Sequence, residues 1–242
     1  MNVIIAKDYD EMSKKAAEVL LDVVKNTENP VLGLATGSSP IGAYQVMVKD
    51  HQENGTDYSK VVSYNLDEYV GLPITHKESY YAFMHQHLFN HVNIKEENVH
   101  VPNGLAEDLD QGCKEYEDML KKVSIDIQLL GIGGNGHIGF NEPGTPVDAE
   151  THVVDLTEKT IADNSRFFIP LGEETPTQAV SMGLASIMRS KKILLIASGA
   201  NKADAVYRMV NDPISVDCPA TILRNHPDVT VIVDAEAGAK LA

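Results

Sequence analysis

Short apolar runs rich in β-branched residues alternate with helical patterns along the whole chain, and this alternation restricts the fold more than any other feature. Most of the runs are near-continuously apolar, as expected for parallel strands that helices cover on both faces. Strands and helices that alternate in this way form right-handed βαβ units, which assemble into a parallel sheet. The sequence therefore predicts an α/β fold with a doubly wound, mostly parallel sheet and helices on both faces.

Six strands and six helices are predicted, and the 242 residues are expected to form a single domain, residues 1–242. The predicted strands are Asn2–Ala6, Val31–Ala35, Val61–Leu66, Asp126–Ile132, Lys192–Ala197 and Val229–Val233. The predicted helices are Ala16–Val24 with Asp8 as its cap, one that starts at Pro40 with Ser39 as its cap, Ser79–Phe89, Leu109–Lys122, Pro176–Met188 and Lys202–Val210. The stretch 141–175, rich in Pro, Gly, Thr and Glu, has the weakest pattern and is a candidate lid.

Charge and composition exclude several classes of protein. A formal net charge of −15 disfavours binding to nucleic acid and to anionic membranes, since both are polyanions. The two cysteines are too few for a disulfide framework or a zinc site. No stretch reaches the roughly 18 apolar residues of a membrane span, and the N-terminus does not read as a signal peptide. We therefore expect a soluble, cytoplasmic protein that acts on a small molecule.

In parallel sheets of this kind, ligands bind beyond the carboxyl ends of the strands. After the second predicted strand comes TGSSP, in which Gly37 allows close approach of the backbone and Thr36, Ser38 and Ser39 supply hydroxyl groups. The helix that follows directs its N-terminal N–H groups to the same place, which suits a phosphate. A plain N-cap turn is the alternative interpretation.

Acidic and basic residues follow other strands. Asp67 and Glu68 come directly after the third strand, so that one carboxylate can face the site and act as a general base while the other packs elsewhere. The alternative is a solvated loop acid. Lys202 lies near a helix N-terminus, where a cation is unfavourable unless an anion is close by, and Arg166 stands beside Phe167. Both cations are candidate phosphate ligands, although Arg166 could also be a surface residue that covers the ring.

The stretch GIGGNGHIGFNEPG, residues 131–144, contains G-x-G-x-x-G but does not fit a dinucleotide site. Such a site needs a helix that starts within the glycine run, and Pro143 and Pro146 forbid one here. Three glycines around Asn135 and His137 instead indicate a tight turn that exposes an imidazole, with Glu142 near enough to orient it. His87 and His91 have one spacing typical of metal ligands but no third ligand, so no metal site is expected.

Four segments, LATGSSP, NLDEYVGL, LLGIGGNGHIGFNEPGT and NSRFF, occur in an order that closely resembles the glucosamine-6-phosphate deaminase family over essentially the whole chain. The resemblance implies a Rossmann-like parallel sheet. It also implies conversion of glucosamine 6-phosphate and water into fructose 6-phosphate and ammonium, in amino-sugar catabolism and with no cofactor.

The resemblance assigns roles as well. Asp67 is the expected base that moves a proton between C2 and C1 of the opened sugar. His137 handles the protons of ring opening, and Glu142 and Asn135 orient it. The expected phosphate ligands are Thr36, Gly37, Ser38, Ser39, Arg166 and Lys202.

Two departures from the family pattern matter. Position 135 is Asn where the larger allosteric members have Asp, so the side chain carries no charge to stabilise an imidazolium. Where those members use basic side chains to bind an activating acetylated sugar phosphate, this chain has His152, Val154 and Asp155, and it ends early, at Ala242. We expect no allosteric activation, and a monomer or small homo-oligomer rather than a hexamer.

Two other functions fit the same architecture. A 6-phosphogluconolactonase or sugar-phosphate isomerase would share the phosphate site, but a lactonase would not need Asp67. A sugar-phosphate sensor would bind without turnover; the acidic balance and the absence of a DNA-binding segment disfavour it.

Overall fold

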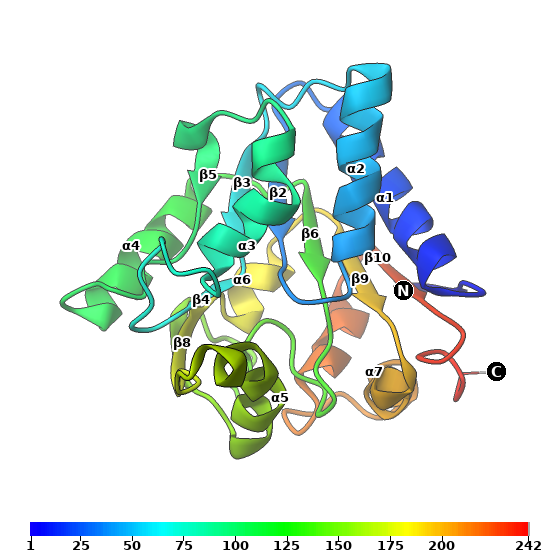
Figure 1. Ribbon diagram of the computed structural model, residues 1–242. Coiled ribbons are helices and arrows are strands. Elements are labelled where there is room, and N and C mark those ends of the chain that lie inside the picture. The colour runs from blue at the N-terminus through cyan, green and yellow to red at the C-terminus, as the bar shows by residue number, and fades with distance from the viewer. Residues whose placement is uncertain (242) are drawn as a thin grey trace.

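The computed structural model describes residues 1–241 and is built on a sheet of seven parallel strands (Figure 1). Their order across the sheet is β1-β10-β9-β6-β2-β3-β5. The strands are β1 (Asn2–Ile5), β2 (Val31–Leu34), β3 (Val62–Asn65), β5 (Val99–His100), β6 (Ile127–Leu130), β9 (Ile193–Ala197) and β10 (Val229–Val233). All six predicted strands are confirmed, and the α/β fold with them. The order reverses between β2 and β6, the point at which such sheets bind ligands.

Helices lie on both faces of this sheet, as predicted; α1 and α2 pack against each other, and α4 and α6 lie behind the strands (Figure 1). The α-helices are α1 (Tyr9–Asn26), α2 (Ile41–Asn54), α3 (Tyr80–His87), α4 (Leu109–Lys121), α5 (Glu158–Phe168), α6 (Leu184–Met188) and α7 (Ala203–Asn211). Short 3-10 turns are η1 (Phe89–His91), η2 (Glu96–Asn98), η3 (Ile169–Leu171), η4 (Ala200–Lys202) and η5 (Pro219–Asn225). The central strands β6 and β9 are buried throughout, which explains their nearly continuous apolar sequences.

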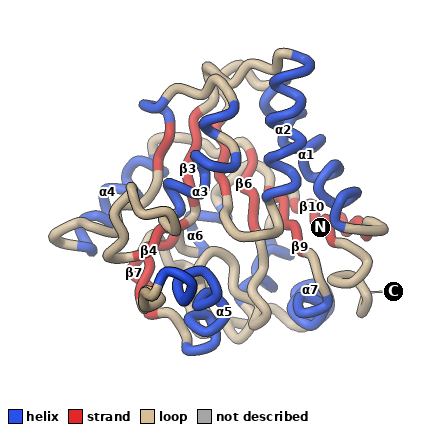
Figure 2. Tube along the Cα trace, in the orientation of Figure 1, coloured by secondary structure: helices blue, strands red, loops and turns tan. Residues whose placement is uncertain are grey.

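The chain passes from the large sheet into a second, antiparallel sheet at Leu66. Its N–H donates to Leu34 at the end of β2, 3.0 Å, and its carbonyl accepts from Met182, 2.7 Å. The second sheet has the order β4-β8-β7, formed by β4 (Asp67–Tyr69), β7 (His152–Asp155) and β8 (Gln178–Ser181). This small sheet and α5 bury a hydrophobic cluster of their own, and Figure 2 shows both below the large sheet.

Two expectations for the second half of the chain need correction. The helix predicted over Pro176–Met188 is wrong, because residues Gln178–Ser181 form the middle strand of the small sheet and only Leu184–Met188 are helical. Gly183 separates the two, at a point where a side chain would collide with the carbonyl oxygen of Ala149. The stretch 141–175, expected to be irregular, contains β7 and α5.

No helix within residues 1–241 is long and apolar enough to cross a membrane. The expectation of a single domain over residues 1–242 stays a prediction.

A buried carboxylate joins α4 to the small sheet and to α6. Glu117 on α4 is 3% exposed and accepts hydrogen bonds from Thr151 N (3.0 Å), Thr151 Oγ1 (2.7 Å) and Ser186 Oγ (2.7 Å). It also pairs with the guanidinium of Arg189. Burial alone would raise the pKa of Glu117, but these donors outweigh it and lower the pKa.

Replacing Glu117 by Ala leaves these donors without an acceptor, and we expect the free energy of unfolding to fall by about 2–4 kcal/mol. Urea denaturation measures this loss. The control is Glu115→Ala, an exposed carboxylate on the same helix, for which we expect a change of less than about 0.5 kcal/mol. Equal losses in the two variants would contradict the anchoring role of Glu117.

Candidate active site

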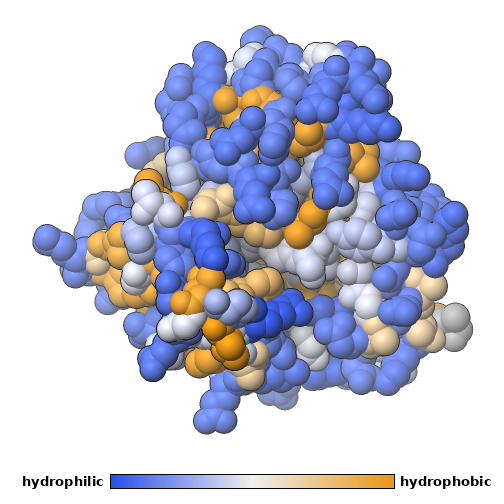
Figure 3. All heavy atoms as spheres, viewed as in Figure 1, coloured by the Kyte–Doolittle hydropathy of each residue, from blue (hydrophilic) through white to orange (hydrophobic). Residues whose placement is uncertain are grey.

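A pocket of about 510 Å³ opens where the loops after β2, β3, β6 and β9 meet α3 and α5. It brings together eight of the ten residues singled out from the sequence: Thr36, Gly37, Ser38, Ser39, Asp67, His137, Arg166 and Lys202. The other two, Asn135 and Glu142, contact His137 from behind. In Figure 3 this face of the molecule is mainly hydrophilic, with hydrophobic side chains gathered around α5.

Asp67 lines the pocket and is only 6% exposed. Within residues 1–241 its carboxylate has no hydrogen-bond or ion-pair partner. Burial, with a smaller contribution from the charge of Glu68, raises the pKa of Asp67 to about 8. A carboxylate that holds its proton this strongly is a much stronger base than an exposed one.

Glu68 points away from the pocket and stabilises the first turn of α3. One oxygen accepts from Tyr80 N at 3.0 Å and from its neighbour Tyr69 N at 2.9 Å, and the other accepts from the next N–H of that turn, 3.0 Å. Adjacent residues on a strand face opposite sides, and here one carboxylate lines the pocket while the other caps a helix.

The glycine-rich turn after β6 exposes the imidazole of His137. A side chain at Gly133 would collide with that ring, and one at Gly136, which has φ 89°, would collide with Cys218. The turn closes on itself, because Gly133 N donates to the carbonyl of His137, 2.9 Å. The glycines therefore serve the placement of the imidazole, as the sequence indicated.

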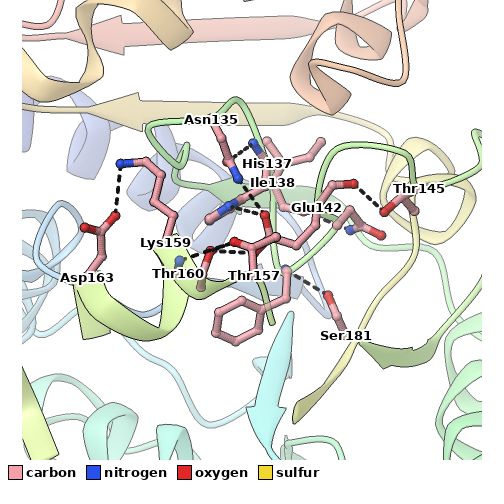
Figure 4. Close-up of polar contacts among 12 residues, drawn as sticks. Asn135, His137, Ile138, Glu142, Thr145, Thr157, Lys159, Thr160, Asp163 and Ser181 are labelled. Atoms are coloured by element: carbon pink, nitrogen blue, oxygen red, sulfur yellow. Dashed lines mark hydrogen bonds and ion pairs between the residues drawn. The ribbon is translucent and has the colours of Figure 1, made fainter. Parts of the chain in front are cut away.

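A carboxylate and an amide orient that imidazole (Figure 4). Nδ1 of His137 lies 3.3 Å from Oε2 of Glu142. Asn135 joins the two: its Nδ2 donates to the same Oε2 at 2.6 Å, and its Oδ1 accepts from the backbone N–H of His137 at 3.1 Å. With Nδ1 engaged in this way, Nε2 is the nitrogen left to exchange protons with a ligand.

Two threonines at the start of α5 complete the surroundings of Glu142. Thr160 donates to Oε1 at 2.5 Å and Thr157, which also caps α5, donates to it at 3.3 Å. Burial by itself would raise the pKa of Glu142, but His137, Thr160 and Asn135 together lower it to about 2. Sequence analysis missed both threonines. T-E-K-T reads as a helix cap and carries no local sign of a partner 18 residues away.

The pocket is also lined by the 36–39 loop and by two cations, Arg166 and Lys202. Neither Arg166 nor Lys202 forms an ion pair within the part of the chain that the structure describes. Burial lowers the pKa of the Lys202 ammonium; Asp163 opposes this, whereas Arg166 and Lys159 add to it. Arg166 also lies over the ring of Phe167, 4.8 Å from its centre, so the residue is both a ring contact and a pocket cation. Unpaired cations this close together suit an anionic ligand.

The helix that follows the 36–39 loop is capped differently from the expectation. It begins at Ile41 rather than Pro40, and no side chain of the loop caps it. Instead, the hydroxyl of Tyr9 on α1 accepts from Gly42 N, 2.9 Å. The expectation that Ser39 caps this helix is therefore wrong, and its hydroxyl lies 3.4 Å from that of Ser198.

No group of three or more His, Cys, Asp or Glu side chains among residues 1–241 could hold a metal ion. His87 lines the pocket, and burial, followed by the charge of His91, lowers its pKa.

The raised pKa of Asp67 makes stability depend on pH. The folded state holds the proton up to about pH 8 whereas the unfolded chain releases it near 3.8, so the stability that protonation provides is lost as the pH rises through this window. Asp67→Asn removes the charge. We expect its melting temperature to exceed that of the wild type by a margin that widens from pH 5 to pH 8 and is constant above. A margin that does not change with pH would contradict the burial argument.

Comparisons with known proteins show which proteins the chain is similar to. A family model described as glucosamine-6-phosphate isomerases/6-phosphogluconolactonase matches residues 7–232. Glucosamine-6-phosphate deaminase of Thermoanaerobacter pseudethanolicus is 52% identical over 240 residues, 99% of this chain and 94% of the relative. That of Clostridioides difficile is 53% identical over 242 residues, 100% of this chain and 97% of the relative.

Solved structures show the same fold. A monomeric glucosamine-6-phosphate deaminase matches all of both chains with a TM-score of 0.97 and 43% identity. The 6-phosphogluconolactonase of Trypanosoma brucei matches 100% of this chain and 98% of its own with a TM-score of 0.81, but at 18% identity this shows the fold alone.

Proposed function

Because the chain belongs to the glucosamine-6-phosphate isomerase/6-phosphogluconolactonase family, we propose that it converts glucosamine 6-phosphate and water into fructose 6-phosphate and ammonium. The reaction is an internal redox exchange between C1 and C2 followed by hydrolysis, so it balances without a cofactor. We assign it to amino-sugar catabolism in the cytoplasm. The observation that carries the proposal is a buried carboxylate in the same pocket as an oriented imidazole and two cations, with no ion-pair partner for the carboxylate or the cations among residues 1–241.

The phosphate of the substrate occupies the end of the pocket formed by the 36–39 loop, Arg166 and Lys202. The phosphate supplies the anionic partner that these two cations do not have among residues 1–241. It is remote from the reacting carbons, so its binding energy serves to hold C1 and C2 against the catalytic groups.

His137 opens the sugar ring. A proton must reach the ring oxygen while the anomeric hydroxyl loses one, and an imidazole whose Nδ1 is engaged by Glu142 can carry out both transfers at Nε2. The anionic Glu142 stabilises the imidazolium formed between the two transfers.

Asp67 then removes the proton from C2 of the open aldehyde, and the aldehyde oxygen gains the proton that the ammonium group at C2 loses, which leaves a neutral enolamine. Return of the proton to C1 yields an iminium ion at C2, to which water adds, and ammonium leaves as the ketone forms. A single carboxylate beside both carbons is sufficient for the two proton transfers at carbon.

The electrostatics of Asp67 favour an amino sugar over a lactone. The buried carboxylate has no cationic partner of its own within residues 1–241, and an ammonium group at C2 of the substrate would lower its pKa and favour the ionised form. A phosphogluconolactone brings no positive charge to this position. The enzyme would therefore become active as a base when the correct substrate binds.

Ammonium release from glucosamine 6-phosphate tests the proposal directly, in an assay that couples ammonium to an indicator enzyme. We expect turnover by the wild type and a loss of about 10²–10⁴-fold in kcat for Asp67→Asn, because a positioned base commonly contributes that much. Binding of the phosphosugar should persist in the variant.

N-acetylglucosamine 6-phosphate is the control substrate, since its amide cannot carry the charge at C2, and it should be turned over poorly. Hydrolysis of 6-phosphogluconolactone that is unaffected by Asp67→Asn, with no ammonium from the amino sugar, would establish the lactonase instead.

We also propose a monomer without allosteric activation. In the stretch where allosteric relatives place basic side chains, β7 carries Asp155, which accepts a hydrogen bond from Gln178 at 2.8 Å and would repel a phosphate. We expect hyperbolic rate curves that N-acetylglucosamine 6-phosphate does not shift, and a single species of monomer mass on sedimentation. Sigmoidal curves that this compound relieves would refute the proposal.

A further inference from the structure

A side chain outside the pocket holds the 36–39 loop. Tyr9, the first residue of α1, does not line the pocket, but its hydroxyl reaches the loop 29 residues further along the chain. The hydroxyl donates to the carbonyl oxygen of Ser38 at 3.0 Å, and the carbonyl oxygen of Ser39 is a second possible acceptor at 3.3 Å. The same hydroxyl accepts from Gly42 N at 2.9 Å. One hydroxyl thus connects the loop to the first turn of α2.

The loop has few other restraints. Among residues 1–241, the hydrogen bonds made by Thr36, Gly37, Ser38 and Ser39 are those with Tyr9 and the contact between the hydroxyls of Ser39 and Ser198. Gly37, which has φ 92°, and Ser38 are exposed. A loop of this kind would lose conformational freedom when it closes on a ligand unless something fixes it beforehand.

The packing of α1 against α2 is adapted to this contact. Gly42 lies on the first turn of α2, and a Cβ there would stand 3.0 Å from Cε1 of Tyr9 and collide with the hydroxyl of Ser13. Only a residue without a side chain lets α1 approach this closely. The contact therefore rests on two features, a hydroxyl on α1 and a glycine on α2.

Capping from another helix also leaves the serines of the loop available. An N-cap Ser or Thr usually turns its hydroxyl back to an N–H of its own helix. Here the hydroxyl of Tyr9 satisfies the N–H of Gly42, and those of Ser38 and Ser39 remain at the pocket.

We propose that Tyr9 is a positioning residue for phosphate recognition: its hydroxyl fixes the 36–39 loop from outside the pocket in the conformation that binds the phosphate group. This inference rests on the proposed function for the identity of the substrate. The positioning role of Tyr9 requires only that the loop binds an anion, whatever the substrate is.

The test is Tyr9→Phe, which removes the hydroxyl and keeps the ring that packs against Gly42. We expect KM for glucosamine 6-phosphate and the inhibition constant of inorganic phosphate to rise together, each by about 3- to 10-fold, because the loop loses the hydrogen bonding that the Tyr9 hydroxyl donates to it and Gly42 N loses its acceptor. Because the reacting carbons are untouched, kcat should stay within about twofold.

Tyr81→Phe is the matched control. Its hydroxyl donates to Glu96 at 2.6 Å, and the residue does not line the pocket. The variant therefore also loses a hydrogen-bonded tyrosine hydroxyl but should bind phosphate as the wild type does. A second measurement needs no turnover: inorganic phosphate should raise the melting temperature of the wild type and of Tyr81→Phe more than that of Tyr9→Phe.

The outcomes separate the inference from the proposed function. If the wild type releases no ammonium but binds phosphate more tightly than Tyr9→Phe, the function fails and the role of Tyr9 stands. If Tyr9→Phe binds phosphate with the same affinity as the wild type and Tyr81→Phe, the proposed role of Tyr9 is wrong whatever the substrate. The same holds if the variant lowers kcat and leaves KM unchanged. The proposed role is also wrong if phosphate has no effect on the wild type.

Discussion

The passage of the chain from one sheet to the other at Leu66 is the constraint on which the site depends. Leu66 is hydrogen-bonded to both Leu34 and Met182, so the next residue is held where the parallel sheet ends and the antiparallel sheet begins. Asp67 is therefore buried, with no partner for its carboxylate among residues 1–241, and its raised pKa follows from that position. Glu68 secures the same segment by capping α3. A general base needs both a fixed position and an environment that makes it basic, and this junction supplies the two together.

Helix α5 connects the parts of the site that lie far apart in the sequence. In its first turn, Thr160 donates a hydrogen bond to Glu142. In its middle, Asn164 Nδ2 donates to the hydroxyl of Tyr69 at 2.9 Å, and its last turn carries Arg166.

Asn135 is better suited to its position next to Glu142 than its lack of charge suggests. An Asp in its place would bring a second anion to Glu142, whereas the amide donates a hydrogen bond to that carboxylate and stabilises its charge.

The parts of the fold that sequence alone could predict are those with a long local signal. Most of the six predicted strands are near-continuous apolar runs, and the rule that ligands bind at the carboxyl ends of parallel strands correctly predicted that the loops at 36–39, 67 and 137 line one pocket. The small sheet was missed because β4 is only three residues long, contains two carboxylates and forms only by pairing with β8, more than a hundred residues away. Thr160 and Tyr9 were missed for a related reason, since each acts through a partner that no spacing within the chain reveals.

In the mechanism that we propose, Asp67, His137 and the 36–39 loop surround one sugar phosphate. A crystal structure of Asp67→Asn with glucosamine 6-phosphate tests it most directly, because the slow variant should retain the substrate. The phosphate should lie among the 36–39 loop, Arg166 and Lys202. C2 should lie within about 3.5 Å of the side chain at position 67, and the ring oxygen or the anomeric hydroxyl should lie within reach of Nε2 of His137. A phosphate bound elsewhere, or a sugar with C2 turned away from residue 67, would contradict the proposed mechanism.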